Sequence, residues 1–141
     1  MTPRNTRTGS VLEQMILPSL EKGGYKYKTQ VNIGKRVGGG KHIVDVIAQR
    51  HDRKAILISL KWQQVSGTAE QKIPYEVISL AEIIMHETDK YEKAYLVLGG
   101  SGWSLRDYYI SGELDKHLIH ACLVEIITLE SFIALANKGK L

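Results

Sequence analysis

Two apolar segments joined by a short polar turn constrain the fold of this chain more than any other feature. Residues 43–48 read Ile-Val-Asp-Val-Ile-Ala, and residues 55–62 read Ala-Ile-Leu-Ile-Ser-Leu-Lys-Trp. Short, nearly continuous apolar runs are typical of strands that are buried on both faces. The polar residues 50–54 between them have the length and composition of a hairpin turn. The segment therefore predicts two neighbouring strands in the centre of a sheet.

Each of these strands contains one charged residue, Asp45 in the first and Lys61 near the end of the second. A charge in such an apolar segment is costly unless it is paired or binds a metal. One interpretation is a structural ion pair at the end of the sheet. The other is catalytic, because an acid that binds Mg²⁺ and a lysine close to the attacked phosphate are suited to phosphodiester cleavage.

The rest of the chain predicts one α/β domain with a mixed central sheet flanked by helices. Residues 1–9 are polar and basic, and we expect them to form a mobile arm. After that arm we expect a helix with a kink at Pro18, three strands, a helix, a strand, and a final strand and helix. The corresponding ranges are 10–22, 25–33, 43–48, 55–62, 69–87, 93–98, 122–128 and 129–137.

Composition narrows the class of protein without identifying it. The 141 residues fit a single domain, and a hydrophobic content of 43% is enough for one core. A net charge of +4 permits nucleic-acid binding but does not require it. A single cysteine, Cys122, excludes an intramolecular disulfide, and its apolar neighbours predict that it is buried. We find no transmembrane or signal segment, so we expect a soluble, cytoplasmic protein without a membrane partner.

An acid on one strand, a hairpin, and x-x-Lys on the next strand together resemble the PD-(D/E)XK nuclease superfamily. The expected element order also resembles the restriction endonuclease-like core of that superfamily, αβββαβ. The resemblance covers roughly residues 10–100. It implies a DNA substrate, a Mg²⁺ cofactor for which Mn²⁺ substitutes, Asp45 as a metal ligand, and Lys61 as the residue that positions or activates the attacking water. Because cutting both strands requires two sites, we also expect a homodimer.

The chain departs from the superfamily pattern at two positions of the motif. Val44 precedes Asp45 where many members have proline, and Ser59 occupies the position of the second acid. A subgroup of restriction enzymes carries this serine and supplies the acid from the next helix, which here contains Glu70 and Glu76. The sequence does not choose between these two glutamates, and either is also favourable as an ordinary first-turn residue.

Further residues are candidates for the same site. Glu13 in the first helix resembles the extra metal ligand of resolvase-like members, although it also has capping-box spacing from Ser10. A basic, glycine-rich turn covers residues 34–41, and it is either a contact with a DNA backbone or a plain exposed turn. The predicted substrate-binding residues are Ser59, Gln63, Lys72 and Lys41.

Three hypotheses for function follow. The first is a Mg²⁺-dependent DNA endonuclease, with restriction-type site-specific cleavage ahead of a Holliday-junction resolvase. The second is a non-catalytic nucleic-acid-binding domain that kept a nuclease-like fold, because Ser59 cannot replace the charge of a carboxylate. The third is an unrelated small α/β domain with a structural Asp–Lys pair.

Overall fold

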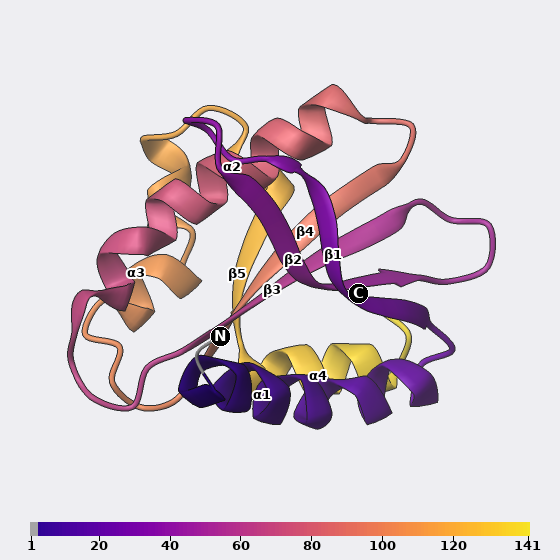
Figure 1. Ribbon diagram of the computed structural model, residues 1–141, viewed down its shortest axis with the longest axis horizontal. Helices are drawn as coiled ribbons and strands as arrows, with labels where there is room; N and C mark the ends of the chain where they lie inside the picture. Colours follow the sequence, from indigo (N-terminus) through magenta and orange to yellow (C-terminus); the bar gives the residue numbers. More distant parts are fainter. Residues whose placement is uncertain (1–2) are drawn as a thin grey trace.

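A mixed five-stranded sheet forms the centre of the molecule (Figure 1). The computed structural model describes residues 3–141, with side chains described for residues 11–67 and 70–141. The sheet has the order β1-β2-β3-β4-β5, in which β1 to β3 are antiparallel and β4 and β5 continue parallel to β3. The strands are β1 (Lys26–Lys35), β2 (Lys41–Gln49), β3 (Ala55–Trp62), β4 (Tyr91–Gly99) and β5 (Val124–Thr128). The expected hairpin and mixed central sheet are confirmed.

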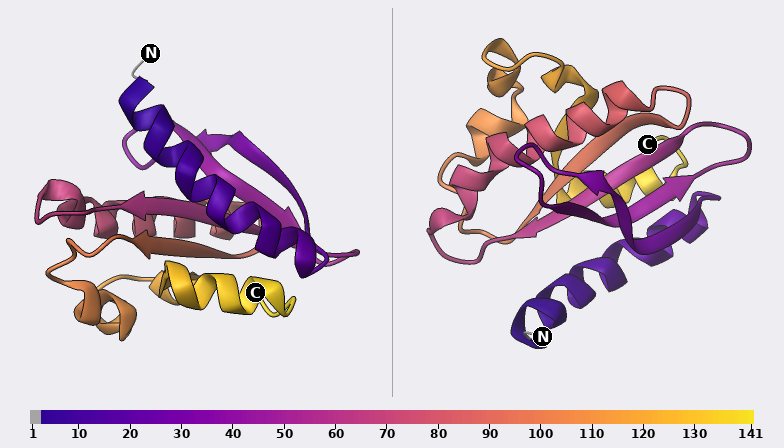
Figure 2. Two further views of the ribbon diagram at one scale, coloured as in Figure 1. Left: turned by 90° about the horizontal axis from the view of Figure 1, so that it is seen from below. Right: turned by 45° about the horizontal axis from the view of Figure 1, so that its top comes forward.

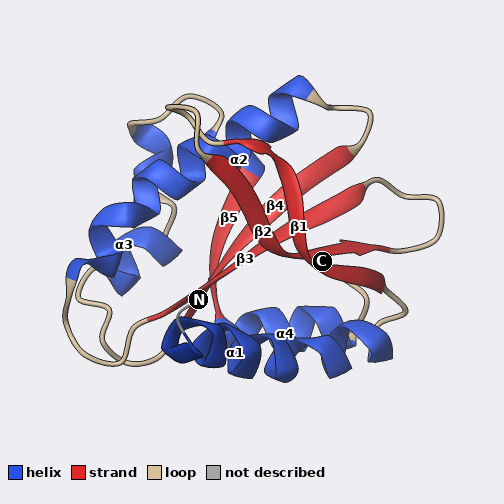
Figure 3. Ribbon diagram, in the orientation of Figure 1, coloured by secondary structure: helices blue, strands red, loops and turns tan. Residues whose placement is uncertain are grey.

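Helices cover both faces of the sheet, as Figures 2 and 3 show. The first and last helices lie side by side on one face, and the longest internal helix covers the other. The helices are α1 (Pro3–Lys22), α2 (Ile73–His86), α3 (Arg106–Ile110) and α4 (Leu129–Asn137). Residues Ala55 to Leu60 of β3 are all buried. This double burial is the physical reason for the continuous apolar run in the sequence.

The first helix is longer than its sequence pattern predicted. It begins at Pro3, so residues 3–9, expected as a mobile arm, are helical, while residues 1 and 2 lie outside the described residues. Proline is favoured in the first turn of a helix because its missing N–H has no intrahelical partner there. The same helix continues past Pro18, where we expected a kink or break, and ends before Gly23.

The region before α2 also differs from the prediction of one continuous helix over 69–87. Residues Thr68–Lys72 form a 3₁₀ helix, and the α-helix begins only at Ile73. Pro74 explains the change, because it lies in the first turn of α2 and cannot donate to a preceding helical turn.

Short 3₁₀ helices at Glu113–Lys116 and Ala121–Leu123 connect α3 to β5. Cys122 lies in the second of these and is exposed, so the prediction that it is buried was wrong. The strand begins two residues later, at Val124, which leaves Cys122 at the surface. None of the described helices is long and apolar enough to cross a membrane.

Candidate active site

The candidate site lies where β2 and β3 separate. Backbone pairing between them runs from Ala48 opposite Ile56 to Val46 opposite Ile58. Immediately beyond this pairing, Oδ2 of Asp45 accepts a hydrogen bond of 2.7 Å from the backbone N–H of Leu60. The carboxylate is therefore fixed against β3, next to the residue that precedes Lys61.

The environment of Asp45 raises the pKa of its carboxyl group. Burial is the largest cause, and the nearby charge of Glu76 adds to it. The Leu60 hydrogen bond, the charge of Lys61 and a hydrogen bond from Gln30 oppose the rise without cancelling it. A partly buried carboxylate near another acid and a lysine is an electrostatic setting in which a bound cation is favourable.

Glu13 approaches Asp45 from α1 through a shared glutamine. The Nε2 atom of Gln30, on β1, donates to Oε2 of Glu13 at 2.5 Å and to Oδ1 of Asp45 at 3.5 Å. Burial raises the pKa of Glu13, the Gln30 hydrogen bond opposes this, and the charge of Asp45 adds to it. The structure thus brings Glu13 into the electrostatic neighbourhood of Asp45.

Glu76 approaches from α2, on the other side of the strands. Its Oε2 accepts a hydrogen bond of 2.9 Å from the Ser59 hydroxyl and lies 3.3 Å from Nε2 of His42. Its Oε1 forms an ion pair with the guanidinium of Arg36. Ser59, His42 and Glu76 are all buried. The serine in the motif is therefore in direct contact with the helix carboxylate.

The partners of Glu76 keep it ionised although it is buried. Desolvation alone pushes the pKa of Glu76 upwards. The hydrogen bond from His42, the charge of Lys61 and the hydrogen bond from Arg36 outweigh that effect and hold this pKa well below its usual range. Lys61 thus acts electrostatically on both Asp45 and Glu76.

Glu70 has other partners. Its Oε2 accepts a hydrogen bond of 2.5 Å from the backbone N–H of Leu105, and its Oε1 lies 3.4 Å from Nε2 of Gln63. Desolvation raises the pKa of Glu70, but hydrogen bonds from Leu105, Ser104 and Gln63 lower it by more. The net shift of this pKa is therefore downwards. The structure brings Glu76, and not Glu70, into contact with Ser59.

The predicted substrate-binding residues differ in burial, since Ser59 and Gln63 are buried while Lys41 and Lys72 are exposed. Gln63 is buried, and its amide donates to the carbonyl of Gly102 at 2.7 Å. Lys41 at the start of β2 and Lys72 at the end of the 3₁₀ helix are exposed. Their contacts with a substrate stay predictions.

Three residues beside the carboxylates were missed by sequence reasoning: Gln30, Arg36 and His42. The glycine-rich turn drew attention to its positive charge in general, but not to Arg36 as the partner of one acid. His42 lies three residues before Asp45, and as one of five scattered histidines it gave no signal of its own. Gln30 carries no charge, and only its geometry identifies it.

The donor set fits a hard divalent cation. No group of three or more His, Cys, Asp or Glu side chains among the described residues is arranged as a complete metal site. Mg²⁺ does not require one, because it is often held by one or two carboxylates together with water and substrate phosphate. Asp45 on β2 and Glu76 on α2 carry carboxylate oxygens of this kind, and both feel the charge of Lys61.

Comparison with known proteins decides the family. A family model described as a PD-(D/E)XK nuclease superfamily domain matches residues 4–140. The chain belongs to the PD-(D/E)XK nuclease superfamily. No curated protein matches the sequence.

A solved structure shares the fold of this chain. A protein titled "Crystal Structure of Protein of Unknown Function AF1548" superimposes with a TM-score of 0.52 at 15% sequence identity. The alignment covers 86% of this chain and 56% of that chain. The PD-(D/E)XK chain described here therefore spans little more than half the length of that protein, and the likeness concerns the fold alone.

Membership of the PD-(D/E)XK superfamily supports a nuclease domain in general. Nucleases of this superfamily generally use divalent metals. The expected restriction endonuclease-like α/β fold is confirmed by the family match and by the sheet.

Proposed function

We propose that this chain is a Mg²⁺-dependent DNA endonuclease that hydrolyses phosphodiester bonds, with restriction-type site-specific cleavage as its first assignment. Mn²⁺ is expected to substitute for Mg²⁺. One observation carries the proposal: Ser59, which stands where a second motif acid is expected, is hydrogen-bonded to Glu76, whose charge is coupled to both Asp45 and Lys61.

Each residue has a proposed role that follows from its position. Asp45 and Glu76 would hold the metal ion, which when bound would polarise the phosphate as a Lewis acid. Lys61 would orient the attacking water and stabilise the negative charge that develops on the phosphate. Ser59, His42 and Arg36 would keep Glu76 ionised and in place, since all three contact its carboxylate.

A Holliday-junction resolvase is the second candidate, and Glu13 favours it. The contact of Gln30 with both Glu13 and Asp45 places a first-helix acid beside the proposed metal ligand. In that case Glu13 would join Asp45 as a metal ligand. The third possibility, a non-catalytic nucleic-acid-binding domain, is an outcome of the experiment below.

The test uses purified protein with plasmid DNA and with a four-way junction, each in Mg²⁺, Mn²⁺ and EDTA. We expect discrete Mg²⁺-dependent fragments from plasmid, and no cleavage in EDTA or by the Asp45→Ala and Lys61→Ala variants. Asp52→Ala and Lys54→Ala are matched controls, because these exposed residues lie in the turn between the same two strands. Both controls should cut as the original protein does.

The remaining outcomes separate the candidates. Cleavage of junctions only would favour the resolvase. Salt-dependent binding without cleavage on a library of random target sequences would favour the binding domain. Full activity in Asp45→Ala or Lys61→Ala would reject the site. Because one small chain carries one site, we propose a homodimer for double-strand cutting, to be measured by light scattering with and without DNA.

A further inference from the structure

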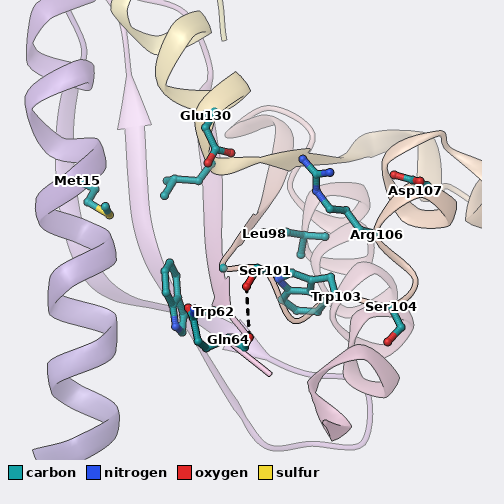
Figure 4. A pocket seen from close by; sticks show the side chains of 12 residues that line it. Met15, Trp62, Gln64, Leu98, Ser101, Trp103, Ser104, Arg106, Asp107 and Glu130 are labelled. Atoms are coloured by element: carbon teal, nitrogen blue, oxygen red, sulfur yellow. Dashed lines mark hydrogen bonds between the residues drawn. The ribbon is translucent and has the colours of Figure 1, made fainter. Parts of the chain in front are cut away.

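A cavity of about 680 Å³ opens beside the end of β3, next to the proposed active site. It lies between α1, the loop that follows β4, and the first turn of α4, as Figure 4 shows. Its volume is within the roughly 300–1,000 Å³ that small-molecule sites occupy. The residues that carry the argument are Trp62, Ser101, Trp103, Arg106, Asp107 and Glu130, all of which line it.

Backbone hydrogen bonds join the segment that follows β3 to the segment that follows β4 beside the cavity. The N–H of Gln63 donates to Gly99 at 3.0 Å, and the N–H of Gly102 donates to the carbonyl of Gln63 at 2.8 Å. A Cβ atom at Gly100, where φ is +91°, would lie 2.4 Å from the Gln63 carbonyl oxygen. Only glycine permits this approach, so the two segments pack directly against each other here.

Trp62 presents an aromatic ring to this cavity in a fixed position. It pairs with Gly99 across β3 and β4, and a Cβ atom at Gly99 would lie 2.8 Å from Cε3 of the indole. The ring therefore packs directly on the glycine backbone, yet Trp62 remains 39% exposed. Trp103 differs, because it is buried and donates its indole N–H to the Gly99 carbonyl at 2.9 Å.

The charges around the cavity favour a base over a phosphate. Among the described side chains of the lining, Arg106 is the one basic residue, and it shares the lining with the carboxylates of Asp107 and Glu130. Two carboxylates repel a phosphate, but they accept hydrogen bonds from the exocyclic amino group of a base. The hydroxyl of Ser101, which also lines the cavity, is a further hydrogen-bond acceptor for such an amino group (Figure 4).

We propose that this cavity binds one unpaired nucleobase of the substrate, stacked on Trp62. Trp62 follows Lys61 directly, and successive side chains of a strand point to opposite faces. A nucleic-acid strand whose phosphate lies at Lys61 would thus place a neighbouring base across the end of β3. In the proposed DNA substrate this base is unpaired, or is flipped out of the duplex near the cut, because a base that stays paired in its stack cannot enter the cavity. The inference rests on the proposed function for its substrate, but it requires only nucleic-acid binding.

The experiment measures binding without cleavage, in EDTA, to oligonucleotides with 2-aminopurine at successive positions. Single strands are compared with blunt duplexes of the same sequence. We expect one position of the single strand to lose fluorescence, and single strands to bind more tightly than duplex. Trp62→Leu should weaken single-strand binding by about fivefold or more, the usual effect of removing one stacking aromatic, and abolish the quenching. Trp62→Phe should retain both in part.

Tyr108→Leu is the matched control, because Tyr108 is 37% exposed and does not line the cavity. Thermal melting of each variant identifies loss of binding caused by misfolding, and Trp62→Phe keeps the test decisive if Trp62→Leu is unstable. Equal binding by the original protein, Trp62→Leu and Trp62→Phe would overturn the proposal, as would absence of binding to any single strand. Trp62-dependent binding combined with no metal-dependent cleavage of any DNA would support the cavity and reject the nuclease.

Discussion

Ser59 and Glu76 are joined by a hydrogen bond of 2.9 Å, which links β3 to α2, the helix packed over it. The serine holds the position at which the motif of the superfamily has its second acid, and its hydroxyl donates to a carboxylate from α2. Glu76 is held ionised and acts electrostatically with Asp45 and Lys61, which supports the proposal that it replaces the missing acid.

Removing the charge of Glu76 should destabilise the fold as well as abolish cleavage. Glu76→Gln removes the buried carboxylate, so Arg36 and His42 lose the anion that they contact. Breaking a fully buried pair costs about 3–5 kcal/mol, and we expect less here because the Arg36 side chain is 26% exposed. Urea unfolding at neutral pH measures the loss. An unchanged midpoint would show that these contacts contribute nothing.

The same carboxylate predicts acid sensitivity. The partners of Glu76 lower its pKa in the folded state below the value of about 4.3 expected in the unfolded chain. Its stabilising contribution is therefore present above that value and is lost as the pH falls through and below it. We expect the midpoint of unfolding to decrease from about pH 5 downwards, and the slope to be shallower in Glu76→Gln. Parallel slopes in the two proteins would contradict this assignment.

Asp45→Asn should have the opposite effect on stability. Burial and the charge of Glu76 raise the pKa of Asp45, so its ionisation above the usual aspartate range costs stability. Asparagine keeps an oxygen for the Leu60 N–H and removes the charge. We expect a higher Tm than the original protein at pH 7, by a few degrees for each kcal/mol gained, together with loss of cleavage. A lower Tm would show that the charge of Asp45 is favourable in the fold.

Two substitutions at Gln30 distinguish the cost of its backbone conformation from the role of its side chain. Its φ is +53°, which is uncommon for a residue other than glycine. Both Gln30→Ala and Gln30→Gly remove the link between Glu13 and Asp45, and we expect each to lower cleavage about tenfold, for a bond worth about 1.4 kcal/mol. Gln30→Gly should be the more stable of the two by about 1 kcal/mol, because glycine adopts this φ freely. Equal stability would indicate that the strand relaxes around the substitution.

Glu70→Gln distinguishes the two glutamates that the sequence left open. Glu70 accepts the Leu105 N–H and approaches Gln63, so its loss should lower Tm. Because Glu70 does not contact Ser59, we expect the folded Glu70→Gln protein to cleave with the kcat and the Mg²⁺ dependence of the original protein. Loss of cleavage in a fully folded Glu70→Gln protein, with cleavage retained in Glu76→Gln, would exchange their roles.

Local pattern was sufficient for the elements of the sheet. The segment predicted for β3, 55–62, matches the observed strand, and the hairpin before it is confirmed. These features are readable because burial on both faces imposes an apolar run along the chain itself. The predictions for the start of α1 and for the 3₁₀ segment before α2 were wrong. Pro3 and Pro74 lie at these two helix starts, but apolar periodicity does not show where a helix begins.

The sequence by itself determined the fold class and the superfamily resemblance, and it singled out Asp45 and Lys61 as candidates, because these depend on short patterns within adjoining strands. Tertiary structure alone decided which glutamate meets Ser59. Residue 76 lies 17 positions from Ser59 and residue 36 lies 40 positions from Glu76, so their contacts depend on how α2 packs across the strands. Pro74 marks the change from 3₁₀ helix to α-helix at Ile73, but the packing of α2 across the sheet brings Glu76 to Ser59, and local sequence does not encode that packing.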